Sequence, residues 1–161
     1  MRKQKKSGPD CSCLATLKID TLANHKSIMN KAKTTRRARG PSALIFIVDD
    51  NAMLVELAGE VLKREGYDVK SFTDPKDVLK AMKEADPKPV ALLTDYEMGE
   101  MNGLDLIVSS HKIHPLLKTM LLSGSIDGAF FANHPAKVHR FLGKPYLPAQ
   151  LQSLVAELLQ P

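Results

Sequence analysis

The stretch "SALIFIVDDN", Ser42 to Asn51, places five apolar residues, Leu44 to Val48, directly before two adjacent aspartates. An uninterrupted apolar run rich in β-branched and aromatic residues is typical of a strand that is covered on both faces, as in a parallel sheet. Asp49 and Asp50 then follow its carboxyl end. One aspartate could cap the next helix, but a cap needs only one side chain. The doublet therefore indicates a further role.

Strand and helix patterns alternate along the rest of the chain, which favours parallel pairing because each crossover returns the chain in the same direction. We expect an α/β fold, a doubly wound five-stranded parallel sheet with helices on both faces. The predicted strands are residues 43–48, 67–72, 90–95, 119–124 and 138–145, and the predicted helices are residues 51–66, 73–87, 103–114 and 147–160.

The helix boundaries carry recognisable signals. Gly66 stands where a left-handed cap ends the first helix, while Asp74 and Pro75 suit the N-cap and first position of the second. The expected core face of the first helix consists of Leu54, Leu57, Ala58, Val61 and Leu62.

Charge divides the chain into two parts. The net charge is +5, but residues 1–42 hold 11 Lys and Arg against two Asp, a net +9, which leaves −4 on residues 43–161. We expect residues 1–42 to be a disordered tail. It could contact nucleic acid or an anionic membrane, serve as a transit peptide, or precede the natural start.

The remaining composition indicates a cytoplasmic protein. Cys11 and Cys13 are the only cysteines, too few for a disulfide framework or a four-cysteine zinc site. No apolar run approaches the ~20 residues that a membrane span needs, so we expect none.

Polar side chains follow four of the five predicted strands. Asp49 and Asp50 end the first, Asp95 the third, Ser123 the fourth, and Lys144 follows the fifth. With the second strand at an edge beside the first, the three aspartates converge where doubly wound sheets bind ligands. Two carboxylates ~4 Å apart repel by about 4 kcal/mol at an effective dielectric of about 20, so such a cluster needs cations or protons. Oxygen ligands favour Mg²⁺, and the set as a whole suits phosphoryl transfer.

Four segments together resemble the receiver domain of bacterial two-component response regulators. The resemblance covers residues 43–160 and implies a flavodoxin-like sheet of order 2-1-3-4-5 and a phosphorylation-controlled signalling switch. The segments, in this order and at these spacings, are "IVDDN", "LLTDYEMGEMNGLDLI", "MLLSG" and "FLGKPY".

The resemblance implies a role for each site residue. Asp95 matches the aspartate that accepts a phosphoryl group from a histidine kinase or phosphotransfer protein. Asp49 and Asp50 match the acidic pair that binds Mg²⁺ together with Asp95, and the backbone carbonyl of Glu97 completes the coordination. Phosphorylation and dephosphorylation of Asp95 are then self-catalysed, and the chain is otherwise not an enzyme.

Three further positions follow from the same resemblance. Ser123 matches the hydroxyl that bonds the phosphoryl group, and Lys144 the lysine that contacts it. Phe141 matches the switch aromatic that turns inward when the hydroxyl moves. A cis peptide bond is implied between Lys144 and Pro145.

The chain departs from the family pattern at three places. Gly99 stands where proline is usual, which predicts a more mobile loop. The Glu97 side chain adds a carboxylate beside the phosphoryl site, which we expect to tune the lifetime of the phosphoryl group. The stretch "SIDGAFFANHPAKV", where a fourth helix is implied, contains Gly128 and Pro135 and shows little periodicity. The partner surface that the family forms there is therefore weakened.

Two other kinds of site on an α/β sheet fit these residues less well. An aspartyl-nucleophile phosphohydrolase on the same fold would carry a second aspartate two residues after the nucleophile, where this chain has Glu97. A nucleotide or flavin site is disfavoured, because the chain has no G-x-G-x-x-G loop.

Because the chain ends after the last predicted helix, we expect a stand-alone receiver that acts on another protein. The alternative is a receiver that regulates nucleic-acid binding by the basic tail.

Overall fold

The computed structural model describes residues 43–125 and 134–160. The predicted tail, residues 1–42, lies outside the described residues, as do Cys11, Cys13 and Gly128. Within the two described ranges, no helix has the length and apolar content that crossing a membrane requires.

A five-stranded parallel sheet forms the centre of residues 43–160, and its order, β2-β1-β3-β4-β5, confirms the predicted arrangement with β2 at an edge. Every residue of β1 and β3 is buried, as expected for strands covered on both faces. The strands are β1 Leu44–Val48, β2 Asp68–Phe72, β3 Ala91–Asp95, β4 Lys118–Ser123 and β5 Arg140–Gly143.

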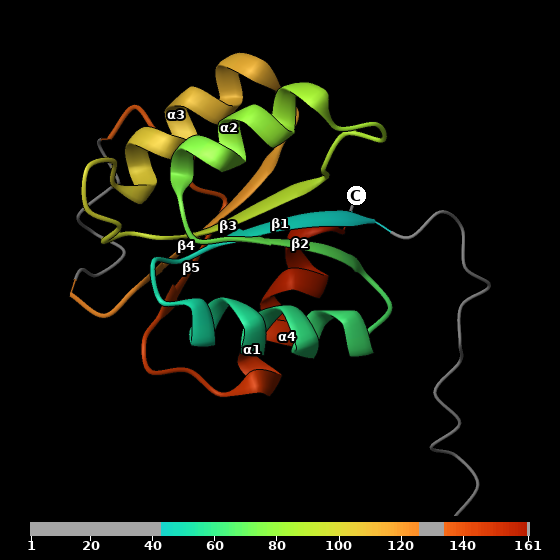
Figure 1. Ribbon diagram of the computed structural model, residues 1–161. Helices are drawn as coiled ribbons and strands as arrows, with labels where there is room; N and C mark the ends of the chain where they lie inside the picture. Colours follow the sequence, from blue (N-terminus) through green and yellow to red (C-terminus); the bar gives the residue numbers. More distant parts are fainter. Residues whose placement is uncertain (1–42, 126–133, 161) are drawn as a thin grey trace, which may run out of the picture. The chain divides into compact units, whose positions relative to one another are not determined.

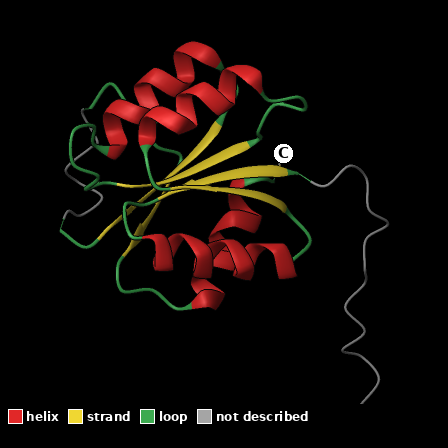
Figure 2. Cartoon of the chain, in the orientation of Figure 1, coloured by secondary structure: helices red, strands yellow, loops and turns green. Residues whose placement is uncertain are grey.

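Helices cover both faces of the sheet, with α2 and α3 on one side and α1 and α4 on the other (Figures 1 and 2). Side chains alternate along β1 accordingly: Ile45 and Ile47 pack with α1 and α4, whereas Phe46 and Val48 pack with α2. The helices are α1 Ala52–Arg64, α2 Pro75–Glu84, α3 Gly103–Ile113 and α4 Pro148–Leu158.

The predicted core face of α1 is partly wrong. Leu54 and Leu57 are 37% and 58% exposed, whereas Val55 is buried. The helix meets the sheet along the face that includes Ala58 and Leu62. Leu54 and Leu57 therefore lie at the side of the helix, where they line a groove with residues of the α4 region. Apolar residues occupy more than one face of this helix, and packing against the sheet decides which face is buried.

The helix caps agree with local chemistry. The Asn51 side chain accepts hydrogen bonds from the backbone N–H of Met53 and of Leu54, so Asn51 and not Asp50 caps α1. Asp74 caps α2 by accepting from the N–H of Lys76, with Pro75 at the first position. Gly66 ends the α1 turn with φ of 96°.

Two glycines shape the connection from β3 to α3. A Cβ on Gly103 would lie 2.2 Å from the carbonyl oxygen of Asp95, so only glycine lets α3 begin this close to the strand end. Gly99 has φ of 72°, which proline, with φ fixed near −65°, cannot adopt. The departure at Gly99 therefore accompanies a different backbone path after Asp95.

A histidine joins β4 to the start of β5. The Thr119 N–H donates to Nδ1 of His139 at 3.0 Å, which requires that nitrogen to be unprotonated. Burial lowers the pKa of His139 below its ordinary 6.5, and the positive charges of Lys137, Lys118, His111 and Arg140 lower it further.

This depression predicts a loss of stability in acid. Above pH ~6.5 His139 is neutral in both states; as the pH falls through that value, the unfolded chain binds the proton first, and the free energy of unfolding decreases until the folded-state pKa is passed. Urea unfolding at pH 7 and pH 5 measures the effect. His139→Asn, which keeps an acceptor, should reduce the decrease, whereas His114→Asn should not. An identical decrease in all three proteins would contradict the assignment.

Candidate functional site

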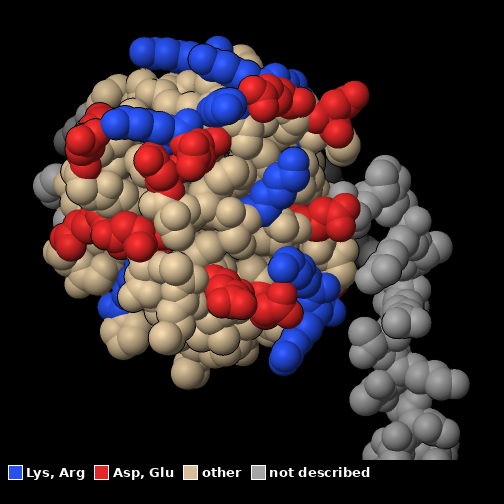
Figure 3. Space-filling view, viewed as in Figure 1, with Lys and Arg blue, Asp and Glu red and all other residues tan. Residues whose placement is uncertain are grey.

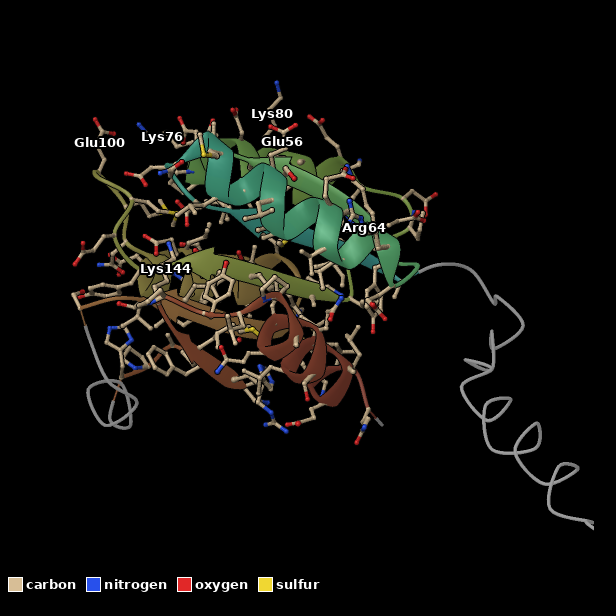
Figure 4. All side chains as sticks on the ribbon, turned by 90° about the horizontal axis from the view of Figure 1, so that it is seen from below. Glu56, Arg64, Lys76, Lys80, Glu100 and Lys144 are labelled. Carbon is tan, nitrogen blue, oxygen red and sulfur yellow. The ribbon has the colours of Figure 1, made fainter. Side chains whose placement is uncertain are left out.

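A hollow of about 460 Å³ opens at the carboxyl ends of the strands. It brings together residues that are up to 95 positions apart in the sequence. Figure 4 shows Lys144 inside this edge of the domain, with Glu100 and Lys76 farther out. The lining residues are Asp49, Asp50, Asn51, Leu54, Asp95, Glu97, Gly99, Ser123, Gly124 and Lys144.

Lys144 lies between two buried carboxylates. Its Nζ forms an ion pair with Oδ2 of Asp49 and another, at 2.6 Å, with Oδ1 of Asp95. Asp49 is 3% exposed and Asp95 6%, so water neutralises little of their charge. The ammonium therefore supplies the positive charge that these two neighbouring acids require.

The three groups shift one another's protonation. Burial raises the pKa of the Asp95 carboxyl and outweighs the lowering by the Lys144 ammonium; the Asp49 charge adds to the rise, and the Glu97 N–H opposes it. Burial alone would lower the pKa of Lys144, but the carboxylates of Asp49 and Asp95 raise it above its ordinary value. Lys144 thus stays protonated at neutral pH, and the Asp95 carboxylate is more basic than an exposed one.

A chain of hydrogen bonds crosses the hollow from β3 to β4. The Glu97 N–H donates to Oδ2 of Asp95 at 2.8 Å, and the Glu97 carboxylate accepts from the Ser125 hydroxyl at 2.6 Å. The Ser125 N–H donates to the Ser123 hydroxyl at 3.2 Å. Ser123 is 2% exposed and lies at the end of β4. The side chain of Glu97 is therefore held across the mouth of the site.

The acidic residues fit a magnesium ion by donor chemistry. Asp50 is exposed on the rim of the hollow, and within the described residues it forms no ion pair. Its carboxylate can therefore serve as a ligand to a metal ion. Across the described part of the chain, no three acidic, His or Cys side chains are already grouped as a metal site. Mg²⁺ typically takes one or two protein carboxylates and keeps several waters, which agrees with two aspartates flanking an open hollow.

The remaining predicted positions lie near this edge. Phe141 is half-buried on β5, paired in register with Leu121 of β4 and packed near Leu104 of α3. The Lys144–Pro145 peptide is cis, and the N–H of Lys144 donates to the carbonyl of Ser123 at 2.7 Å.

Sequence reasoning missed two features of the site. Ser125 was not singled out, although its position two residues after Ser123 was a usable signal. The second is a groove of about 380 Å³ between α1 and α4 that adjoins the acidic hollow, since Leu54 and Lys144 line both.

The chain is similar in sequence to known proteins. The chain matches the family of response regulator receiver domains over residues 45–156. It is 29% identical to the chemotaxis protein CheY of Thermotoga maritima over 109 residues, 66% of this chain and 89% of that protein. It is also 29% identical over 143 residues to the sensor kinase CckA of Brucella abortus, which covers 86% of this chain but 15% of that protein.

Some of these relatives are much longer than the matched region. The chain spans 37% of the probable transcriptional regulatory protein TcrX of Mycobacterium tuberculosis, to which it is 30% identical over 88 residues.

Solved structures agree on the fold. The chemotaxis protein CheY4 of Vibrio cholerae superposes with a TM-score of 0.68 at 18% identity, covering 73% of this chain and 99% of that one. A CheY-like receiver domain protein of Methanospirillum hungatei gives 0.65 at 24% identity, covering 72% and 92%. With the family match over most of residues 43–160, these findings establish that the chain belongs to the response regulator receiver domains, the signalling domains of two-component systems.

Proposed function

We propose that this chain is a phosphorylation-controlled switch that accepts a phosphoryl group on Asp95. The observation that carries the proposal is the position of Lys144 between the buried carboxylates of Asp49 and Asp95, beside the Ser123 hydroxyl. The donor is a histidine kinase or a phosphotransfer protein, and the reaction takes place in the cytoplasm. The chain catalyses its own phosphorylation and dephosphorylation and has no separate substrate.

The transfer follows from the charges of the site. An oxygen of the Asp95 carboxylate attacks the phosphorus of a phosphohistidine whose ring is protonated on its other nitrogen. The P–N bond breaks and its electron pair stays on the ring nitrogen, so the histidine leaves as a neutral imidazole. Mg²⁺ bound by Asp49, Asp50, Asp95 and the Glu97 carbonyl would neutralise phosphoryl oxygens. Lys144 provides a second positive charge, because its ammonium can pair with the phosphoryl group where it now pairs with Asp95.

The switch uses groups on β4 and β5. We infer that the Ser123 hydroxyl donates to a phosphoryl oxygen and that Phe141 shifts inward as the end of β4 adjusts. The phosphoryl group adds negative charge where Lys144 and Ser123 can bond it, and this biases the domain between two arrangements. Phe141 is half-buried and packs near Leu104 and Leu121, and the inward shift would be a change of its side-chain rotamer.

We further infer that the donor protein docks beside the site on an apolar strip, defined as Met53, Leu54 and Leu57 of α1. These side chains are 77%, 37% and 58% exposed. Leu54 lines both the groove and the acidic hollow, so a helix laid on the strip would hold its phosphohistidine close to Asp95. Two outputs stay predictions: a receiver that acts alone on another protein, and a receiver that regulates a nucleic-acid-binding tail.

Phosphorylation of Asp95 tests the central proposal. With acetyl phosphate and Mg²⁺, the intact mass of the wild type should increase by one phosphoryl group that is stable in acid and labile in base. Asp95→Asn should stay unmodified, and Asp50→Asn should need more Mg²⁺ because a charged carboxylate ligand is replaced by a neutral amide. An unmodified wild type, or equal labelling of Asp95→Asn, would refute the proposal.

The docking strip makes a separate prediction. The donor is a phosphotransfer protein that phosphorylates the wild type. Leu57→Arg should slow phosphoryl transfer from this donor roughly tenfold, since an apolar contact residue is replaced by a charged one. Labelling by acetyl phosphate should be unaffected, because Leu57 does not line the acidic hollow. Leu116→Arg, at a leucine 84% exposed that lines neither the groove nor the hollow, is the control. Equal transfer rates for the two variants would place the donor elsewhere.

Glu97 makes a third prediction, on the lifetime of the phosphoryl group. The Ser125 hydroxyl holds the Glu97 carboxylate over the site, where it can orient and deprotonate an attacking water. Glu97→Ala should therefore slow dephosphorylation roughly tenfold, a smaller effect than the usual loss of a positioned general base. Glu100→Ala removes a nearby exposed acid that pairs with Lys76 and should leave the rate unchanged. Release of phosphate from the purified phosphorylated proteins gives the rates, and equal rates for wild type and Glu97→Ala would sink the idea.

A further inference from the structure

Cationic side chains gather at the edge of the sheet opposite the phosphoacceptor site, where β4 and β5 begin. Four basic side chains lie near enough to His139 to lower its pKa: Lys118, Lys137, Arg140 and His111. The imidazole rings of His111 and His139 are 6.0 Å apart. We call the group of Lys112, Lys118, Lys137, Arg140, His111 and His139 the basic edge. Its lysines and arginine are exposed.

Little negative charge neutralises the basic edge. Within residues 43–125 and 134–160, Lys112, Lys118 and Lys137 form no ion pair, and Arg140 has a single carboxylate, that of Glu157, at 3.9 Å. Acidic and basic side chains are intermixed on the face drawn in Figure 3. Residues 43–161 as a whole carry −4, so the charge of the basic edge is opposite in sign to the net charge of the domain. An anionic partner would relieve its repulsion.

The basic edge also contains an apolar hollow. A depression of about 320 Å³ is lined by Val108, Pro115 and Pro135, with His111, Lys112 and Lys137 completing its wall. Leu116, next to Pro115, is 84% exposed. A hollow with apolar residues and positive groups matches a ligand that carries both an apolar side chain and carboxylates.

We propose that the basic edge binds an acidic peptide segment of a partner protein, with an apolar side chain in the hollow and flanking Asp or Glu side chains on the lysines. Nucleic acid fits less well, because none of the described residues that line the hollow is a Phe, Tyr or Trp on which a base could stack. The carboxylates of the partner pair with Lys112 and Lys137, which face the hollow together.

This surface is separate from the phosphoacceptor site. None of its residues lines the acidic hollow, and β4, with Lys118 at one end and Ser123 at the other, spans about 17 Å between the two. A phosphodonor and an acidic segment can therefore bind at the same time. The inference does not depend on phosphorylation of Asp95.

Fluorescence anisotropy with the full chain tests the proposal. The probe is a labelled peptide of alternating Glu and Leu, compared with the same peptide carrying Gln for Glu. Lys112→Glu with Lys137→Glu should raise the Kd for the acidic peptide at least about tenfold, since two contacts become repulsive. Lys80→Glu with Lys83→Glu, on exposed positions of α2, changes the net charge equally and should leave the Kd within about twofold of wild type.

Four results would overturn the proposal. The first is an equal loss of affinity in the α2 control, which would indicate long-range charge alone. The second is unchanged affinity in the variant with Lys112 and Lys137 reversed, with the fold verified by circular dichroism. The third is equal binding of the Gln peptide. The fourth is tighter binding of a single-stranded DNA of equal charge through the same two lysines, which would make the partner a nucleic acid.

Discussion

The site depends on one ammonium group held between two buried carboxylates. Asp49 and Asp95 end neighbouring strands, where parallel pairing forces them together, and neither is more than 6% exposed. Without Lys144 the two charges would repel in a region with little water, and removing one partner of such a buried set typically costs about 3–5 kcal/mol. Lys144 therefore makes the acidic edge compatible with a folded domain and leaves a cation ready for an incoming phosphoryl group.

The order of the strands explains how this cation reaches its partners. Lys144 follows β5, which is separated from β3 by β4, so its side chain crosses the end of β4 to reach Asp95. Its backbone N–H is bonded to the carbonyl of Ser123, which anchors the crossing. Lys144 thus neutralises the two carboxylates through its side chain and binds the end of β4 through its backbone.

Much of the fold follows from patterns that are local in the sequence. Apolar runs predict β1 and β3 because both faces of these strands are covered, and Asp74 with Pro75 marks the start of α2 because unpaired N–H groups need an acceptor there. The core face of α1 could not be assigned in this way. Its apolar residues occupy more than one helical face, and only packing against the sheet decides that Ala58 and Leu62 are buried while Leu54 and Leu57 stay at the surface.

The sequence by itself determined the identity of the chemistry: acidic residues, a hydroxyl and a lysine at strand ends, in an order that predicts the sheet and the site. Tertiary structure alone decided which of these groups touch. The hydrogen bond between Glu97 and Ser125, and the hollow that both Lys112 and Lys137 line, bring together residues far apart in the chain. Hydrophobic periodicity records burial along each element, but it contains no information on which polar side chains of different elements face each other, because that depends on sheet order and helix rotation.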